Sequence, residues 1–470
     1  MSTSKFRKTS IIITLGPATD SPERLAELID NGVDVFRLNM SHAQHDWCRE
    51  AVHNIRRIGK EKNRHVAILF DLQGPSIRTG DLEAPYQLSV GDKLEFRKSD
   101  AEPKLELSTT VNYGGMINDV STGDTLVVDN GTMLMTIDEK QEDRIICTVN
   151  TAGTLGNRRH INLPGVRLNL PALTKKDHSD LAVAVECESD YIAGSFVRDA
   201  AHVHELRGAM EKLGGTAHII SKVEDQEAIK NIDDIILASD IIMIARGDLG
   251  IEVNVEELPL IQRHITRRCH TLGRRVIVAT HMLESMITNP TPTRAEATDV
   301  SNAVYEEADA IMLSGETSVG EFPIRCVQTL DRIARRMEGT ETVGNAALAI
   351  LNTNKGKVVK AAISLADSLE GAHIVVFTKR GVMSVQTALL RPKAHIHSFA
   401  STTATCRRLA LARGIQNYHL PFFDDPLTTI NSAVDHLREN NIVAAGTPLV
   451  IISDTLRKNQ TVDSILLVHA

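Results

Sequence analysis

The clearest structural signal in the chain lies in two segments, His218-Ile219-Ile220-Ser221-Lys222-Val223-Glu224 and Ile241-Ile242-Met243-Ile244-Ala245-Arg246-Gly247-Asp248-Leu249-Gly250. Each begins as a buried type of β-strand and ends in charge, and a helical pattern separates them. Lys222 and Glu224 are two residues apart and therefore project from the same side of the first strand. Asp248 follows the second strand in a turn flanked by glycines. A lysine between two carboxylates at strand ends predicts a site for a divalent metal and an anionic substrate.

Length and composition exclude several classes of protein. The chain has 470 residues, enough for about two to four domains. Its net charge of -8 includes no basic block, which argues against nucleic-acid binding. We find no signal-peptide pattern and no run of about 18 apolar residues, so no membrane contact is expected. The six cysteines form no CxxC pair, which favours reduced thiols and a cytoplasmic location.

Short apolar runs alternate with helical patterns, which is typical of parallel βα units. Eight such runs precede residue 320, at 11–14, 33–39, 66–72, 191–196, 218–224, 241–245, 276–280 and 310–314. The first helix has clear punctuation: Ser21 as N-cap, Pro22 at the first helical position and Gly32 at the C-terminal end. Eight units predict an α/β fold of the closed (β/α)8 TIM barrel type.

One interval interrupts this alternation. Between Pro75 and about Leu170 the pattern changes to short strands with tight turns, and Asp129-Asn130-Gly131 predicts a hairpin. We interpret the interval as an all-β lid domain inserted after the third barrel strand. After about residue 345 the alternation resumes, and we expect a separate, open α/β domain. The expected boundaries are 1–74 and 172–344 for the barrel, 75–171 for the lid and 345–470 for the C-terminal, regulatory domain.

The C-terminal domain is expected to begin with a helix at 358–369. Its predicted strands lie at 373–378, 395–399, 418–422, 448–454 and 463–469.

The second barrel strand ends in Arg37-Leu38-Asn39-Met40-Ser41-His42, and the alternate residues Arg37, Asn39 and Ser41 share one face. An arginine in a core strand needs an anion, which a substrate phosphate or carboxylate would supply. The alternative is a structural ion pair with a neighbouring strand. At the catalytic end of a barrel the functional interpretation is favoured.

Other strand ends carry polar groups of the same kind. Asp71 ends the third strand, and Gly74-Pro75 turns the chain into the lid, where Arg78 could reach a nucleotide phosphate or stay solvated. The seventh strand ends in Thr280 and His281. Further along, Thr291 is a candidate helix cap, and Arg294 and Glu296 are left open between catalysis and subunit contacts.

Lys222, Glu224 and Asp248 form the centre of the predicted site. Few carboxylate ligands, completed by substrate oxygens, suit Mg²⁺ or Mn²⁺ better than Zn²⁺. The lysine would stabilise an oxyanion formed in the transition state. A buried salt-bridge network is the alternative.

Together these motifs resemble pyruvate kinase over nearly the whole chain. The matching segments are Thr14-Leu15-Gly16-Pro17-Ala18-Thr19, Arg37-Leu38-Asn39-Met40-Ser41-His42, Asp71-Leu72-Gln73-Gly74-Pro75, Asn162-Leu163-Pro164-Gly165, Ser221-Lys222-Val223-Glu224, Ala245-Arg246-Gly247-Asp248-Leu249-Gly250, Pro292-Thr293-Arg294-Ala295-Glu296 and Met312-Leu313-Ser314-Gly315-Glu316. The resemblance implies phosphoryl transfer from phosphoenolpyruvate to ADP, giving pyruvate and ATP in the last step of glycolysis. It also implies a homotetramer.

The resemblance further implies roles for individual residues. Lys222, Arg37 and Thr280 would be catalytic: Lys222 at the phosphoryl group, Arg37 on phosphoenolpyruvate and Thr280 where the enolate is protonated. The Gly247 and Asp248 backbone would hold the substrate carboxylate. The remaining assignments are Glu224 and Asp248 for Mg²⁺; Asn39, Ser41, Asp71 and the Leu72 carbonyl for K⁺; and Arg78, Arg159, Asn39 and His42 for the nucleotide.

The chain departs from the family pattern at three places. His281 stands where glutamine is usual and predicts a pH dependence near neutrality. Arg159 replaces a common lysine and keeps its charge. The effector loop keeps Thr378, Gly381 and Ser384. It carries Arg380, Val382 and Met383 where small hydroxyl residues are common, which argues against activation by fructose 1,6-bisphosphate. A different phosphorylated effector is the alternative, and its candidate ligands are Thr378, Lys379, Arg380, Ser384, Arg457 and Lys458.

Two other functions compete with this interpretation. Another Mg²⁺-dependent barrel enzyme that acts on phosphoenolpyruvate or pyruvate, of mutase or aldolase type, would need a metal and an arginine too. It would not explain the inserted lid or Arg78 at its hinge. A degenerate, non-enzymatic paralogue should lack Lys222, Glu224 or Asp248, and all three are present.

Overall fold

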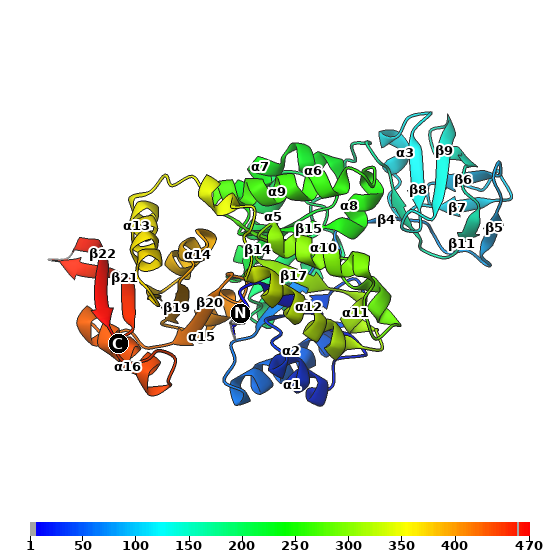
Figure 1. Ribbon diagram of the computed structural model, residues 1–470. Helices are drawn as coiled ribbons and strands as arrows, with labels where there is room; N and C mark the ends of the chain where they lie inside the picture. Colours follow the sequence, from blue (N-terminus) through cyan, green and yellow to red (C-terminus); the bar gives the residue numbers. More distant parts are fainter. Residues whose placement is uncertain (1–5, 458–459) are drawn as a thin grey trace.

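The computed structural model describes residues 6–457 and 460–470. Its centre is a closed barrel of eight parallel strands, in the order β1-β17-β16-β15-β14-β13-β3-β2 (Figure 1). The strands are β1 (Ser10–Thr14), β2 (Val35–Asn39), β3 (Ala67–Asp71), β13 (Tyr191–Gly194), β14 (His218–Val223), β15 (Ile241–Ala245), β16 (Arg275–Ala279) and β17 (Ala310–Leu313). They coincide with the eight predicted runs, so the predicted (β/α)8 barrel is confirmed.

Helices surround the barrel strands. They are α1 (Pro22–Asp30), α2 (His45–Glu61), α4 (Lys175–Glu186), α5 (Ala200–Lys212), α6 (Gln226–Lys230), α7 (Ile232–Ala238), α8 (Arg246–Glu252), α9 (Leu258–Leu272), α10 (Arg294–Tyr305), α11 (Gly315–Ser318) and α12 (Pro323–Glu338), with a 3-10 turn η1 (Glu284–Ile287). No helix within the described ranges is long and apolar enough to cross a membrane.

Helix capping follows the sequence at α1 but not at α10. The Ser21 side chain accepts a hydrogen bond from the Arg24 amide, and Pro22 is the first residue of α1. At α10 the cap is Thr293, so the prediction of Thr291 is wrong. Thr293 and Glu296 form a capping box, in which each side chain accepts from the other residue's amide. The acidic residue three positions into the helix therefore decides where α10 starts.

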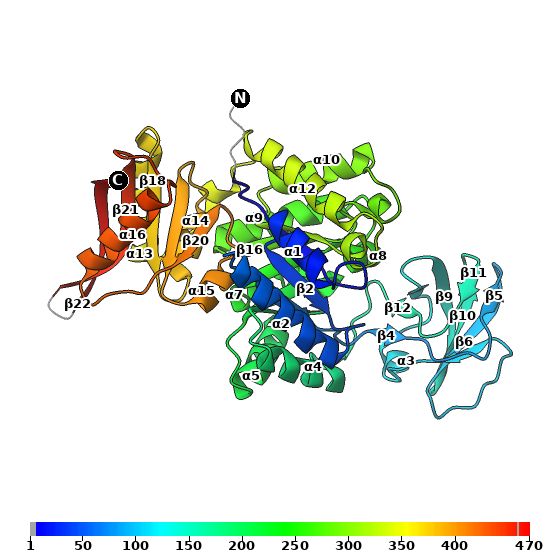
Figure 2. The ribbon, with the colours of Figure 1, turned by 90° about the horizontal axis from the view of Figure 1, so that it is seen from below.

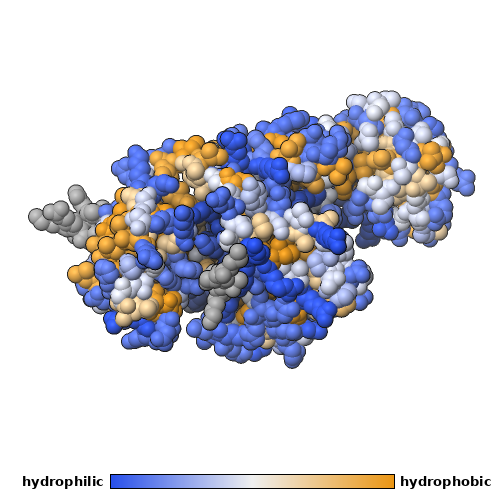
Figure 3. All heavy atoms as spheres, in the orientation of Figure 1, coloured by the Kyte–Doolittle hydropathy of each residue, from blue (hydrophilic) through white to orange (hydrophobic). Residues whose placement is uncertain are grey.

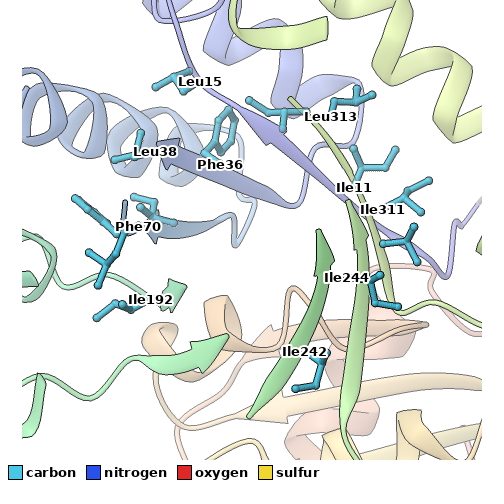
Figure 4. Close-up of a cluster of buried hydrophobic side chains, with 14 of the residues drawn as sticks. Ile11, Leu15, Phe36, Leu38, Phe70, Ile192, Ile242, Ile244, Ile311 and Leu313 are labelled. Atoms are coloured by element: carbon cyan, nitrogen blue, oxygen red, sulfur yellow. The ribbon is translucent and has the colours of Figure 1, made fainter. Parts of the chain in front are cut away.

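Two hydrophobic layers hold the barrel together. One lies between strands and helices and contains Ile11, Phe36, Phe70, Ile244 and Leu313 (Figure 4). The other fills the barrel interior with residues such as Ile12, Val35, Tyr191, Ile220 and Met243. Alternate residues of a strand serve the two layers, as Ile11 and Ile12 do, because successive side chains point to opposite faces.

The inserted segment forms an all-β unit with its own core and one short helix, α3 (Met116–Asp119). A seven-stranded sheet has the order β4-β12-β8-β9-β10-β6-β7, and β11 pairs with β5 separately. Its strands are β4 (Ile77–Arg78), β5 (Tyr86–Leu88), β6 (Lys93–Arg97), β7 (Ser108–Thr110), β8 (Thr125–Val128), β9 (Met133–Lys140), β10 (Arg144–Val149), β11 (Gly153–Leu155) and β12 (His160–Asn162). The predicted hairpin joins β8 to β9.

The C-terminal α/β unit is an open sheet of order β20-β19-β18-β21-β22, in which only β21 and β22 pair antiparallel. Figure 2 shows it on the opposite side of the barrel from the lid. Its strands are β18 (His373–Thr378), β19 (His395–Ala400), β20 (Ile415–His419), β21 (Pro448–Arg457) and β22 (Gln460–His469). Its helices are α13 (Asn354–Ser368), α14 (Val382–Leu389), α15 (Thr403–Arg408) and α16 (Pro426–Glu439), after the turn η2 (Asn345–Leu348).

The strand predicted at residues 418–422 lies earlier in the chain, as β20. The segment 418–422 was expected to be extended, but β20 ends at His419. The register explains the shift, because Ile415 pairs with Ile396 and both are buried against the core of this unit. The predicted helix at 358–369 also starts earlier, at Asn354, where Thr353 caps α13. Lys458 lies outside the described residues, and so does the Arg457 side chain.

Three histidines meet on β18 and β19. His373 Nδ1 lies 2.7 Å from His397 Nε2, and the ring of His395 is 5.1 Å from that of His373. Burial lowers the pKa of His373 to about 4 and that of His397 to about 3, and it also lowers the pKa of His395. Lys8 adds to the shift of His395. These rings are therefore neutral in the folded protein near pH 7.

Acid is expected to destabilise this unit through His397. Unfolded histidine takes up a proton near its ordinary pKa of about 6.5, whereas folded His397 does not. Above about pH 6.5 the neutral ring therefore costs no stability. Below it, the free energy of unfolding falls by at most ~1.4 kcal/mol for each pH unit, because only the unfolded state binds the proton. Urea midpoints at pH 7.5, 6 and 5 should fall less steeply for His397→Phe than for the wild type. Equal slopes would contradict this prediction.

Candidate active site

The carboxyl ends of the barrel strands and the lid enclose a cleft of about 470 Å³. Sequence-predicted residues from β2, β3, β14, α8 and the lid line it together: Arg37, Asn39, Ser41, His42, Asp71, Leu72, Arg78, Arg159, Lys222, Glu224 and Asp248. The lining also includes Ser195, Phe196, Asp129 and His160, which sequence reasoning did not single out. Ser195 could have been flagged, because it directly follows an apolar run, as Asp71 and Thr280 do.

Lys222 is the centre of a charge network. Its Nζ lies 2.8 Å from Glu224 Oε1 and 3.5 Å from Asp71 Oδ1, and it donates a hydrogen bond of 2.7 Å to Ser195 Oγ. Burial alone would lower the pKa of Lys222, but Asp71 and Glu224 outweigh burial and raise it well above the usual value. Lys222 is therefore a permanent cation at the base of the cleft.

Glu224 and Asp248 are the two carboxylates predicted to hold a metal ion, and both line the cleft. Glu224 Oε2 accepts a hydrogen bond of 2.6 Å from the Phe196 amide, while buried Oε1 has an ion-pair contact with Lys222 but no hydrogen bond. Burial raises the pKa of Glu224 to about 7, against the effect of Lys222 and with a further contribution from Asp248. A divalent cation between the two carboxylates would relieve this repulsion.

The donor set fits Mg²⁺ better than a transition metal. Among the described residues no group of three or more His, Cys, Asp or Glu side chains could hold a metal ion. Mg²⁺ is commonly bound by one or two carboxylates with water and substrate oxygens. Glu224 and Asp248 with an incompletely satisfied oxygen match that pattern.

Asp248 lies in the first turn of helix α8, not in the glycine-flanked turn that we predicted. Arg246 holds this helix in place through a 2.7 Å ion pair with Asp299 and a 2.7 Å hydrogen bond to the Thr280 carbonyl. The helix starts directly after β15 because these tertiary contacts stabilise the helical conformation more than Gly247 and Gly250 destabilise it. As a result, Asp248 points toward the cleft.

Arg37 forms an ion pair with Asp71 on the neighbouring strand β3, which is the alternative role predicted for it. Its Nε donates to Asp71 Oδ2 at 2.7 Å and its Nη1 to Thr14 Oγ1 at 2.9 Å. The side chain nevertheless lines the cleft, so the ion pair orients it and leaves part of the guanidinium facing the cavity. Arg37 and Lys222 together hold the pKa of buried Asp71 below its usual value, although burial opposes this.

The four predicted K⁺ ligands also border the cleft. Asp71 Oδ1 is buried without a hydrogen-bond partner, and Asn39 Oδ1 accepts from the Ser41 amide at 3.2 Å. The Leu72 carbonyl accepts from Ser195 Oγ at 2.8 Å. Each of these three oxygens keeps a lone pair that could accept a cation.

Thr280 lies beside the cleft and not among its lining residues. Its backbone φ is 70°, in the left-handed region, and its Oγ1 accepts a 2.7 Å hydrogen bond from the Gly247 amide. That amide was predicted to bind substrate and is engaged by Thr280 in this structure. His281 is exposed and lies outside the described lining.

The lid contributes cations above the barrel residues. Arg78 Nη1 donates to the Arg158 carbonyl at 3.0 Å, and Arg159 pairs with Asp129 at 3.2 Å. The lid hinge needs glycine at position 74, where φ is 69° and an added Cβ would lie 2.8 Å from Ser195 Cβ. The hinge therefore packs directly on the residue that binds Lys222.

Only some of the predicted effector residues line the same cavity. Thr378, Lys379 and Arg380 line a cavity of about 550 Å³ with Phe377, Phe422 and Phe423. Ser384 is fully buried and bonds to Ser398 Oγ at 2.6 Å, so it does not reach this cavity.

Fold and site together define a class: a TIM-barrel enzyme with two carboxylates beside a fixed lysine and with arginines on its lid, a set of charges suited to phosphoryl transfer. Known families agree. The sequence models "Pyruvate kinase, barrel domain" and "Pyruvate kinase, alpha/beta domain" match residues 6–327 and 356–469. The chain belongs to the pyruvate kinase family and is a phosphotransferase.

Individual relatives agree with this assignment. Pyruvate kinase of Geobacillus stearothermophilus is 39% identical over 95% of this chain and 77% of its own length. Plastidial pyruvate kinase 2 of Arabidopsis thaliana is 38% identical over 95% and 78%. A crystal structure of a pyruvate kinase from Cryptosporidium parvum superposes with a TM-score of 0.93 at 31% identity, over 98% of this chain and 96% of that one.

Proposed function

We propose that the cleft transfers the phosphoryl group of phosphoenolpyruvate to ADP, giving pyruvate and ATP. The observation that carries the proposal is the placement of Lys222, Glu224 and Asp248 beneath Arg78 and Arg159 of the lid. Phosphoryl transfer needs in-line placement of two anionic substrates and neutralisation of their charge. Lys222 and the two lid arginines lie around the carboxylates that are assigned to the metal. Together these groups would place the two substrates and neutralise their charge.

Lys222 is assigned to the phosphoryl group that moves between the substrates. Its contacts with Ser195, Glu224 and Asp71 fix the ammonium in position before substrate arrives. A preorganised cation in a water-poor site stabilises developing charge without reorganisation cost. Arg37, oriented by Asp71 and Thr14, is assigned to phosphoenolpyruvate.

Glu224 and Asp248 are assigned to Mg²⁺ or Mn²⁺, which when bound neutralises phosphoryl oxygens. The Gly247 and Asp248 backbone is assigned to the substrate carboxylate. For Gly247 this requires substrate to replace Thr280 Oγ1 as the partner of the amide. The Thr280 hydroxyl donates its own proton to the Ala279 carbonyl at 2.6 Å. To deliver a proton to the enolate, the role we assign to it, the hydroxyl would have to turn from that carbonyl toward the substrate.

Arg78, Arg159, Asn39 and His42 are assigned to the nucleotide, and Asn39, Ser41, Asp71 and the Leu72 carbonyl to K⁺. All of them border the same cleft, so a bound cation and the nucleotide phosphates would be close. The cavity formed by Thr378, Lys379 and Arg380 is assigned to a phosphorylated effector whose apolar part packs on phenylalanine rings.

A homotetramer is proposed for the whole enzyme. Figure 3 shows hydrophobic surface gathered over the C-terminal unit, and the exposed apolar residues there include Val382, Phe423 and Leu427. Exposed apolar patches of this kind are typical of interfaces. The cytoplasmic location remains a prediction.

A coupled assay tests the reaction. Pyruvate should form from phosphoenolpyruvate only when ADP and Mg²⁺ are both present, and more quickly in K⁺ than in Na⁺. Pyruvate formation without ADP, or a product still carrying the phosphoryl group, would instead favour a barrel enzyme of mutase or aldolase type.

A further inference from the structure

The last lid strand, β12, lies against helix α8, which carries Asp248. His160 and Asn162 project from the same side of β12. His160 Nδ1 lies 4.0 Å from Asp248 Oδ1, and Asn162 Nδ2 donates a 3.0 Å hydrogen bond to Glu252 Oε1. Asp248 and Glu252 are four residues apart and so share a helix face. Figures 1 and 2 both show α8 at the end of the barrel that faces the lid.

The Asn162–Glu252 pair is buried. Asn162 is 5% exposed and Glu252 is 9% exposed, and both line a cavity of about 300 Å³ beside the lid hinge. Burial raises the pKa of Glu252 to about 7, and the hydrogen bond from Asn162 opposes this rise. Loss of either partner would leave a buried polar group unsatisfied, so the two side chains constrain each other.

Other contacts hold the C-terminal end of α8, where Glu252 lies. The Gln226 side chain donates to the Glu252 carbonyl. A Cβ at Gly131, in the hairpin between β8 and β9, would lie 3.9 Å from Ile251 Cγ1. The lid therefore meets this short helix in two places, and the helix presents Gly247 and Asp248 at its other end.

We infer that the hydrogen bond between Asn162 and Glu252 is a latch between lid and barrel that sets the position of Asp248 relative to Lys222 and Glu224. Asn162 and Glu252 are then positioning residues: neither is assigned to substrate or metal, and both act through α8. The kinetic consequence rests on the proposed function, but the effect on α8 does not.

A charge swap tests the latch. Asn162→Asp places two carboxylates in contact and should push lid and helix apart. Adding Glu252→Gln restores one donor and one acceptor with reversed polarity. We expect Asn162→Asp to lower kcat/KM and to raise half-saturating Mg²⁺ by about 10–100-fold, the usual effect of residues that orient metal ligands. The double variant should return to within about threefold of the wild type.

A second readout does not depend on activity. Hydrogen exchange of the full-length protein, followed in peptides covering residues 246–257, should be faster in Asn162→Asp by about tenfold and near the wild-type rate in the double variant. Thr154→Val is the matched control, because it removes a lid hydrogen bond to Gln87 that is remote from α8. Its exchange and kinetics should be unchanged.

The outcomes separate the two proposals. Unchanged α8 exchange in Asn162→Asp, or no recovery in the double variant, would overturn the latch. A wild-type enzyme without ADP-dependent pyruvate formation would overturn the proposed function and leave exchange as the test of the latch. Should Asn162→Asp not fold, Asn162→Ala removes the donor without adding charge and is expected to change both readouts in the same direction.

Discussion

Replacing Lys222 with methionine is expected to lower kcat by about 10²–10³, the usual cost of removing a preorganised group that stabilises transition-state charge. The ammonium is buried, contacts Ser195, Glu224 and Asp71, and keeps its charge at all relevant pH values. Methionine has similar length and no charge. Steady-state kinetics at saturating Mg²⁺ and substrates, with metal binding followed calorimetrically, would measure the effect.

The matched control for this change is Lys62→Met. Lys62 forms a 2.6 Å ion pair with Asp30 on the protein surface, and such pairs contribute only about 0–1 kcal/mol. We expect its kinetics to equal those of the wild type. If Lys222→Met kept more than about a tenth of kcat, the lysine would not have the role that we assign to it.

Asp71→Asn is expected to destabilise the protein by about 3 kcal/mol or more, because it removes the anion from a buried ion-pair group. Asp71 is 1% exposed and accepts from Arg37, and its other oxygen faces Lys222. Without this carboxylate each cation loses one of the partners that orient it. Activity per folded molecule should therefore also fall, and the K⁺ response should weaken. Urea unfolding and K⁺ titrations would measure the two effects.

Asp309→Asn distinguishes lost stability from lost function. Asp309 is equally buried, pairs with Arg391 at 2.7 Å and accepts from the Val276 amide at 2.8 Å. It precedes β17 and so lies at the barrel end opposite the cleft. We expect a comparable loss of stability with normal activity per folded molecule. Equal catalytic losses in both variants would mean that Asp71 acts only through stability.

The barrel was predictable because its determinants are local. Each strand is a short apolar run, and β-strand geometry places Lys222 and Glu224 on one face whatever surrounds them. The hairpin at Asp129-Asn130-Gly131 also follows from local backbone preference, since all three residues have positive φ. Closure of eight such units then brings all strand ends to one rim, where the cleft forms.

Other features depend on contacts between residues distant in sequence. The helical start at Arg246 needs Asp299, and the β20 register needs Ile396. The contacts of Ser195 with Lys222 and of His160 with Asp248 depend on partners from other elements. No sequence pattern specifies such pairings.

Local sequence patterns were sufficient to predict the barrel, the inserted lid, the C-terminal sheet and the charged groups at the strand ends, because periodicity and turn chemistry are short-range. Three features became visible only in the folded protein: Arg37 shares Asp71 with Lys222, Ser384 is buried away from the predicted effector cavity, and Asn162 donates to Glu252. Those outcomes depend on burial and on the choice of hydrogen-bond partner, which are set when distant segments pack together.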